Sequence, residues 1–307
     1  MYPIRVNRDY LDPHFMAWLL VSDGFTEYAD EESRRARMPK LNRDQLFAWQ
    51  TPLPPLAEQK RIAGILKEQM AAVERARRSA KAQLQAAESL PAAYLRAVFH
   101  SPEAQAWPRK KLGEVSAITS GVQKCPEGAA VKHHRPYLTV RNVQRGFLDL
   151  THVDRFEVTE AELTRLRLQP GDLLIVEGNR SLEHIGRNAL FLGDGQEWIH
   201  QNHIIRVRLR HDVLLPEFVS RFLNSDMGRA QMVEKAKTTS GLYTLSAGKV
   251  AELETPLCSL AHQHRIAAQL SGQVASAERL RQALAEQLDA INTLPAALLR
   301  EAFSGRL

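Results

Sequence analysis

An internal repeat constrains the fold of this chain more than any other feature of its sequence. Displacing the sequence by 204 positions places residues 51–99 on residues 255–303 without a gap, and 25 of those 49 positions are identical. A weaker match with small gaps continues upstream, where Pro13 and Phe15 align with Pro216 and Phe218. Because repeated sequences form repeated structural units, we expect both copies to share one local architecture. The first copy reaches Met1 while the second is preceded by a further block, so the chain reads as one and a half units.

Each copy contains a stretch that is typical of a long helix. Residues 56–89 contain no Pro, a single Gly, and many Ala, Gln, Arg, Lys and Glu residues. Apolar residues alternate at spacings of four and three, which is the seam of a coiled coil, so we expect the two helices to pair. We also expect the prolines at 91 and 295 to end each helix. The seam positions are Leu66, Met70, Val73, Arg77, Ala80, Leu84 and Ala87, and Leu270, Val274, Ala277, Arg281, Leu284, Leu288 and Ile291.

Both copies place an arginine, Arg77 or Arg281, at the same seam position. A polar residue at a seam can fix the register or contact a partner at some cost in stability. Alternatively, the long side chain reaches solvent past the apolar contact. The sequence leaves both interpretations open.

The block between the two copies, residues 107–254, has a different pattern. Short apolar runs alternate with Gly, Pro, Asn and Asp, which predicts strands near 137–140, 173–176, 189–192 and 203–209. Residues 216–224 carry aromatic and apolar side chains at helical spacing, as do residues 13–21 in the first copy. The sequence therefore predicts an α+β fold with one β-rich domain and two long, paired helices.

Composition excludes several classes of protein. The chain has 41 basic and 35 acidic residues, and the net charge of +6 suits a polyanionic partner without demonstrating one. Two cysteines are too few for a disulfide framework. The chain starts with no apolar segment of signal length, and no run of 18 uncharged apolar residues occurs. We therefore expect a cytoplasmic protein.

Several motifs resemble those of one known family. Residues 52–59 read Pro-Leu-Pro-Pro-Leu-Ala-Glu-Gln, and the long helix that follows ends in Leu90-Pro91. This pattern resembles the conserved region of type I restriction-modification specificity (S) subunits. The central block resembles a target-recognition domain of that family in order and spacing, through Trp107 and residues 111–115, 137–138, 142–144, 168–174, 177–179, 185–187, 201–203 and 238–241.

The resemblance implies a non-catalytic subunit with two target-recognition domains, each of which reads one half of a split DNA site. In the family, an antiparallel pair of long helices separates these domains and holds two modification subunits. This chain departs from the pattern, because its first recognition domain is reduced to residues 1–50. The expected organisation is a remnant of the first recognition domain (1–50), a helical spacer (51–106), an intact recognition domain (107–254) and a second spacer (255–307).

The implied partners are double-stranded DNA, type I modification (methyltransferase) subunits, and restriction subunits through them. A second copy of the chain, or another S polypeptide, could supply the missing half. Three alternatives stay open: an inactive fragment, a scaffold that has lost recognition, and a stand-alone DNA-binding protein.

No motif in the sequence predicts catalysis or a cofactor. There is no Gly-rich loop ending in Gly-Lys-Ser or Gly-Lys-Thr for a triphosphate, and no Asn or Asp before Pro-Pro-aromatic for methyl transfer. Residues 58–60 have the Glu-x-Lys spacing of a nuclease, but the repeat replaces them with His-Gln-His at 262–264, which favours a structural role. His133, His134 and Cys125 have no fourth ligand at a credible spacing, so we expect no metal.

The candidates for DNA contact are polar or basic residues in predicted loops. Arg and Lys can bind phosphates or guanine, and Asn and Gln can pair with adenine edges. Some of these residues are expected to hold the fold instead. The candidates are Lys124, Arg141, Asn142, Gln144, Asn179, Arg180, Arg187, Lys235, Lys237, Thr238, Thr239, Ser240 and Tyr243.

Overall fold

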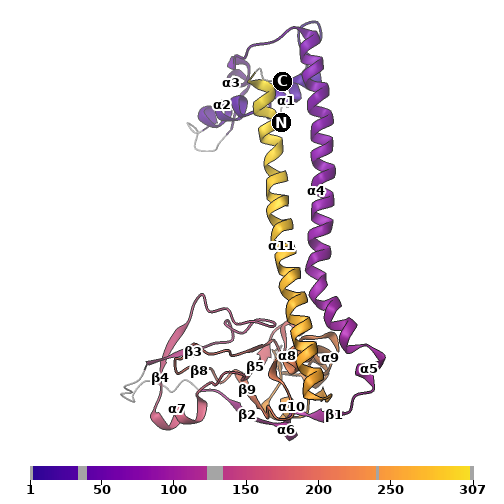
Figure 1. The fold of residues 1–307 in the computed structure, drawn as a ribbon. Coiled ribbons are helices and arrows are strands. Elements are labelled where there is room, and N and C mark those ends of the chain that lie inside the picture. Colours follow the sequence, from indigo (N-terminus) through magenta and orange to yellow (C-terminus); the bar gives the residue numbers. More distant parts are fainter. Residues whose placement is uncertain (1–2, 34–39, 123–133, 240–241, 305–307) are drawn as a thin grey trace. The chain divides into compact units, whose positions relative to one another are not determined.

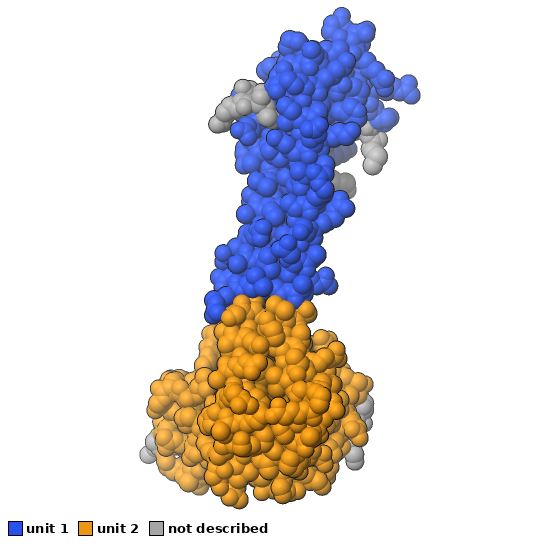
Figure 2. Space-filling model, turned by 45° about the vertical axis from the view of Figure 1, so that its right-hand side comes forward, with its two compact units in different colours: residues 1–88, 278–307 blue, residues 89–277 orange. Residues whose placement is uncertain are grey.

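The computed structural model describes residues 3–33, 40–122, 134–239 and 242–304, which form two compact units. Unit 1 comprises residues 1–88 and 278–307, and unit 2 comprises residues 89–277 (Figure 2). Two long helices, α4 (Leu56–Phe99) and α11 (Leu260–Phe303), contribute to both units. Unit 1 contains the start of α4 and the end of α11, and unit 2 contains the reverse. The helices therefore run antiparallel, as the α+β prediction with a coiled coil requires (Figure 1).

The prediction that proline ends each long helix was wrong. Pro91 lies inside α4 and Pro295 inside α11, and each helix continues for two further turns. A proline in a helix removes one hydrogen bond and clashes with the preceding turn. In unit 2 the packing beyond Pro91 offsets that cost, since Leu95 and Phe99 are buried in the core.

The burial pattern of α4 and α11 follows the predicted seam. Arg77 is the exception, because about half of its side chain is exposed, and it pairs with Glu74 one turn earlier. Arg281 pairs in the same way with Glu278, at 2.6 Å. Such pairs on one helix favour the interpretation in which both arginines reach solvent. The buried seam residues are Leu66, Ala80, Ala87, Leu270, Ala277 and Leu284, and the half-buried ones are Met70, Val73, Leu84, Val274, Leu288 and Ile291.

Unit 1 packs three short helices against the long ones. They are α1 (Pro13–Leu19), α2 (Asp23–Ser33) and α3 (Arg43–Ala48). Asp12 caps α1 by accepting hydrogen bonds from the amides of His14 and Phe15, and Asn42 caps α3. The core of this unit joins the two ends of the repeat, and its buried residues are Phe15, Leu19, Ile62, Ala63, Leu66, Leu299 and Ala302.

Unit 2 is built around a four-stranded antiparallel sheet in the order β2-β9-β5-β7. Its strands are β2 (Ser116–Ser120), β9 (Ile204–Leu209), β5 (Leu173–Val176) and β7 (Asn188–Leu190). A second sheet contains β4 (Asp154–Glu157), β3 (His134–Leu138) and β8 (Ile199–His200), and a third contains β10 (Lys237–Thr239), β11 (Leu242–Thr244) and β6 (Gly178–Asn179). A two-stranded sheet pairs β1 (Arg109–Lys111) with β12 (Glu254–Pro256). All four predicted strand regions overlap a strand, and 173–176 agrees with β5 at both ends.

Short helices complete unit 2. They are α5 (Pro102–Gln105), α6 (Leu112–Val115), α7 (Glu160–Leu166), the 3-10 helix η1 (Leu182–His184), α8 (Pro216–Asn224), α9 (Asp226–Lys235) and α10 (Ala247–Ala251). Helix α8 presents Phe218 and Phe222 to Phe99 at the end of α4, with ring centroids 5.7 and 5.2 Å apart. Within the described residues, no helix is both long and apolar enough to cross a bilayer.

The repeat forms the same packing arrangement in each unit, around one buried glutamine near the start of a long helix. We call this arrangement the joint; it centres on Gln59 in unit 1 and on Gln263 in unit 2. In unit 1, Gln59 accepts a hydrogen bond from the amide of Asp12 and donates to the carbonyls of Tyr10 and Pro54. In unit 2, Gln263 likewise accepts from the amide of Leu215, and it donates to the carbonyls of Val213 and Cys258. The two glutamines are 1% and 0% exposed. The nuclease-like spacing at residues 58–60 is therefore part of a structural joint.

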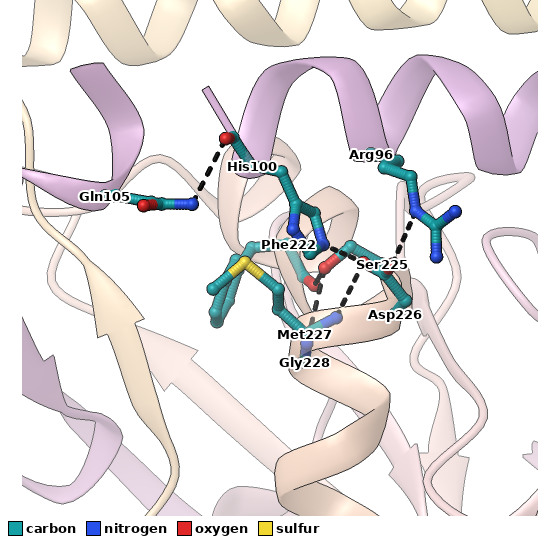
Figure 3. Close-up of polar contacts among 8 residues, drawn as sticks. All are labelled: Arg96, His100, Gln105, Phe222, Ser225, Asp226, Met227 and Gly228. Carbon is teal, nitrogen blue, oxygen red and sulfur yellow. Dashed lines mark hydrogen bonds and ion pairs between the residues drawn. The ribbon is translucent and has the colours of Figure 1, made fainter. Parts of the chain in front are cut away.

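The joint of unit 2 also contains a polar contact between α4 and the start of α9. Asp226 Oδ2 accepts a hydrogen bond from Arg96 Nε at 3.0 Å, and Asp226 Oδ1 lies 2.9 Å from His100 Nε2 (Figure 3). Ser225 caps α9 by accepting from the amide of Gly228. Burial raises the pKa of Asp226, but the contacts with His100 and Arg96 outweigh it and the net shift is downward. The equivalent ion pair of unit 1 joins Arg300 and Asp23 at 3.5 Å.

Candidate nucleic-acid interface

Three arginines of unit 2 gather around the 3-10 helix η1. Arg145 Nη2 donates a hydrogen bond to the backbone carbonyl of Glu183 at 2.9 Å. Arg229 Nη2, from α9, donates to the same oxygen at 3.4 Å. Arg187 precedes β7, and its positive charge acts on Arg145. We call Arg145, Arg187 and Arg229 the arginine cluster; all three side chains are half-buried.

The arginine cluster concentrates positive charge in a partly buried place. Burial, followed by the charges of Arg229 and Arg187, lowers the pKa of Arg145 to about 10, against the opposing effect of Glu183. Burial also lowers the pKa of Arg187. Both shifts mean that the protein disfavours the cationic form, although arginine remains protonated at neutral pH. An anion that binds between the guanidinium groups would relieve this repulsion, and a phosphate suits the geometry of the guanidinium.

A network of buried amides fixes Arg145. Asn188 is fully buried, and its carbonyl accepts a hydrogen bond from the amide of Gly146, beside Arg145. Asn188 and Asn224 exchange side-chain hydrogen bonds at 3.0 and 3.1 Å. The Oδ1 atom of Asn224 also accepts from Arg145 Nη1 at 3.4 Å. Because Gly146 has a positive φ of 88°, the turn after Arg145 favours glycine.

Two of the candidates named from the sequence hold each other. Arg187 Nη1 donates to Gln144 Oε1 at 3.3 Å, and Arg187 Nη2 donates to the carbonyl of Val140. Gln144 Nε2 donates to the carbonyl of Arg141 at 2.6 Å. Arg141 is exposed and forms an ion pair with Asp154 at 3.2 Å. These contacts organise the loop between β3 and β4 beside the arginine cluster.

Asn142 has a structural position. Its side chain is 3% exposed, and Oδ1 accepts from both the amide and the hydroxyl of Thr139. Its Nδ2 donates to the carbonyls of Asp149 and His152. The amide thus makes four hydrogen bonds inside the protein, which leaves it no free group for a base edge.

The remaining candidates within the described residues belong to the sheet of β6, β10 and β11 or flank it in sequence. The strand register places Tyr243 opposite both Asn179 and Thr238. Lys237 and Thr239 belong to β10, and Arg180 is exposed after β6. Lys235 ends α9 and pairs with Glu252 at 3.3 Å. Lys124 and Ser240 lie outside the described residues.

Sequence reasoning missed two of the three arginines in the cluster. Its restriction to loops excluded Arg229, which lies on α9. Arg145 lies in a loop directly after Gln144, but nothing in the sequence indicates that η1 and α9 approach it. The signal that could have identified Arg145 is its position in the Gln-Arg-Gly turn beside a named candidate.

The described residues contain no group of three or more His, Cys, Asp or Glu side chains that could hold a metal ion. Of the three metal ligands considered from the sequence, Cys125 and His133 lie outside the described residues. The third, His134, belongs to β3 and contacts Glu157 of the neighbouring strand at 3.1 Å.

Comparisons with known proteins identify proteins that are similar to this chain in sequence. No protein-family model matches the sequence. The specificity subunit of the type I restriction enzyme EcoKI from Escherichia coli K12 is 30% identical over 268 residues, which is 83% of this chain and 57% of that protein. The specificity subunit of StySPI from Salmonella potsdam is 22% identical over 97% of this chain and 66% of its own length. The chain thus spans less than two thirds of these curated relatives.

Two solved structures share the fold. A chain of a type I R-M system, studied for complex assembly and conformational transition, matches 99% of this chain and 74% of its own, with a TM-score of 0.74 and 23% identity. The HsdS subunit from Thermoanaerobacter tengcongensis matches 99% of this chain and 73% of its own, with a TM-score of 0.66 and 23% identity. The repeat and the paired long helices thus accompany a similarity in sequence to type I restriction enzyme specificity subunits and a fold shared with the two solved structures.

Proposed function

We propose that this chain is the DNA-recognition subunit that directs a type I restriction-modification complex to one half of a bipartite DNA site. In this proposal residues 107–254 are the recognition domain and the chain itself has no catalytic role. Adenine methyltransferase subunits, and restriction subunits through them, supply the chemistry in the cytoplasm. The paired helices would separate two half-sites and dock the modification subunits. A second S polypeptide is one source of recognition for the other half-site.

The arginine cluster is the observation that carries the proposal. Two of its guanidinium groups share the carbonyl of Glu183, and the Glu183 carboxylate counters only part of the charge that acts on Arg145. A DNA phosphate offers the negative charge and the acceptor oxygens that would complete this arrangement. Contacts to phosphate orient a protein on DNA, so the cluster would set the register in which nearby residues read bases.

Base reading falls to the neighbouring residues that keep free polar groups or an aromatic face. We assign this role to Arg180 and Tyr243, and to Arg141, which is exposed and uses only one of its guanidinium nitrogens to contact Asp154. Lys124, Gln144, Asn179, Lys235, Lys237, Thr238, Thr239 and Ser240 remain proposed contacts. Asn142 is left out, because its hydrogen bonds are used inside the protein.

The first experiment is to co-express the chain with the modification subunit encoded beside it and to map methylated adenines in the host DNA by sequencing. The expected result is a purified complex and a defined motif, either bipartite or palindromic. A stable complex without methylation at any defined motif would favour a scaffold. Failure to form a complex, together with the absence of methylation, would overturn the proposal.

The second experiment tests the arginine cluster in that complex. Arg145→Gln and Arg229→Gln should each weaken binding to cognate and unrelated duplexes alike, and each should reduce the slope of log affinity against log salt by about 1. Arg8→Gln in unit 1 is the matched control and should leave the slope unchanged. An unchanged slope in both cluster variants would rule out a phosphate contact at the arginine cluster. It would not affect the outcome of the methylation test.

A further inference from the structure

In unit 2, residues 107–111, which follow α4 and α5, pack onto the joint. Trp107 lies against Phe218 and His262, with ring centroids 6.2 and 5.4 Å apart. The guanidinium of Arg109 lies over the ring of Phe222, 5.3 Å from its centroid. The segment therefore covers the aromatic face that α8 and the start of α11 present.

The same segment adds a strand to the joint. Strand β1 pairs antiparallel with β12, so that Lys110 lies opposite Thr255. The amide of Leu257 donates to the carbonyl of Pro108 at 2.8 Å, and the amide of Leu112 donates to the carbonyl of Leu253 at 2.9 Å. Thr255 is fully buried as a result.

Among the described residues of unit 1, no segment fills the equivalent surface. The repeat places Thr51, Pro52 and Leu53 where unit 2 has Thr255, Pro256 and Leu257. Residues 50–55 belong to no described strand, and the side chain of Leu53 is 48% exposed. A cavity of about 650 Å³ opens here, which we call the unit 1 groove; its lining includes Phe15, Trp49, Leu53, Glu58, Ile62 and Phe303.

We propose that the unit 1 groove binds an extended segment of another polypeptide with the chemistry of residues 107–111, namely a tryptophan followed by a short basic strand. The tryptophan fills the apolar cavity, and the strand pairs with residues 51–53 by addition to an open edge. This interaction goes beyond DNA recognition, because it needs no DNA.

The groove lining carries two carboxylates and one guanidinium, that of Arg300, so it has an excess of negative charge that is opposite to the charge of a basic strand. Glu58 stands at the position of His262, so a carboxylate replaces the imidazole against which Trp107 packs in unit 2. Asp23 also lines the groove. Asp23 pairs with Arg300 at 3.5 Å and Glu58 pairs with Arg61 at 2.6 Å, so a basic strand would share both carboxylates with these arginines. Arg109, Lys110 and Lys111 supply three positive charges on the segment that fills the unit 2 joint. Opposite charges at the rim favour association and set its orientation.

The test uses the full chain and a fluorescent peptide with the sequence of residues 101–113, followed by fluorescence anisotropy. Saturable binding of one peptide per chain is expected. A peptide that carries Trp107→Ala should bind at least 10-fold more weakly, since it loses the aromatic group that fills the cavity. Absence of binding by the unmodified peptide would overturn the proposal.

A pair of protein variants locates the site. Leu53→Arg should weaken binding at least 10-fold, because it places a positive charge and a longer side chain at the groove. Leu280→Arg is the matched control, since Leu280 is 46% exposed on α11, lies outside the groove, and should bind the peptide normally. Circular dichroism confirms that both variants fold. Equal binding to both variants would mean that the peptide exchanges with the segment of unit 2, and this would also overturn the proposal.

Discussion

The two joints of the molecule share a sequence signature but differ in burial. Gln59 and Gln263 make the same three hydrogen bonds, and both are buried. Phe99, at the end of α4, is 1% exposed, whereas Phe303, at the end of α11, is half-buried. The repeat therefore specifies the hydrogen bonds around the glutamine of each joint. The segment that packs on the joint determines how much apolar surface is buried.

The largest difference is expected from truncating the terminal aromatic of each helix. Phe99→Ala should destabilise unit 2 by about 3–5 kcal/mol, because Phe99 packs on two rings in a closed core. Phe303→Ala should destabilise unit 1 by about 1–2 kcal/mol, since its ring is partly solvated and contacts Phe15. Hydrogen exchange read by mass spectrometry measures each unit separately. Equal losses would contradict the difference in burial.

Acid should affect unit 2 more than unit 1. Burial, and then the charge of Arg206, lowers the pKa of His200 to about 4. Below the ordinary histidine pKa of about 6.5, the unfolded chain takes up a proton that the folded unit does not. Stability is thus complete above that pH and falls as the pH drops toward 4, by about 3 kcal/mol at most. Unit 1 contains one histidine, His14, which is exposed.

Urea unfolding at pH 7 and pH 5, followed by hydrogen exchange in each unit, checks this prediction. His200→Asn keeps a donor for the carbonyl of Ile204 and should flatten the pH dependence of unit 2, even if it lowers stability overall. His184→Asn, at an exposed histidine, is the control and should leave the dependence intact. A wild-type unit 2 with equal stability at both pH values would contradict the prediction.

Replacing the buried glutamines tests whether their hydrogen bonds stabilise the two joints equally. Gln59→Met and Gln263→Met keep the side-chain length but leave one amide and two carbonyls without partners in each joint. Each variant should lose about 2 kcal/mol, and the loss should be confined to its own unit. Unit-resolved hydrogen exchange provides the measurement. If only the unit 2 variant lost stability, the two joints would differ in more than their hydrogen bonds indicate.

The smallest effect is expected at the two aspartates. Asp226→Asn should cost less than about 1 kcal/mol, because its contacts with Arg96 and His100 are partly exposed. The lowered pKa of Asp226 means that this stability is present at neutral pH and is lost as the pH falls through its folded pKa. Asp23→Asn should cost less still, since the distance to Arg300 is 3.5 Å. Thermal unfolding at high salt should remove both differences.

The sequence was sufficient for the elements whose signals are periodic. The heptad spacing predicted the paired helices, and the apolar run at 173–176 predicted a strand. In the structure this strand, β5, lies between β9 and β7, and all four of its residues are buried. The proline rule failed at Pro91, since Leu95 and Phe99 gain more from packing than the helix loses. Local preference could not reveal that gain, because it depends on Phe218 and Phe222 more than a hundred residues away.

The candidate site was less predictable. Asn142 has the side chain of a base reader, yet its four hydrogen bonds close a turn whose partners include Asp149 and His152. Arg229 belongs to a helix and meets Arg145 only through the folding of residues 145–229 into one unit. Residue type indicates what a side chain can bind, but only the tertiary contacts determine whether it is free to bind.

Unit 1 combines the start of α4 with the end of α11, and this has a consequence for the order in which the chain folds. The core of unit 1 contains Phe15 and Ile62, but also Leu299 and Ala302. During synthesis, helices α1, α2 and α3 must wait for residues 299–302 before that core can close, whereas unit 2 needs nothing beyond residue 277. We therefore expect unit 2 to form first during translation. The three short helices of unit 1 are made before unit 2 but become stable after it.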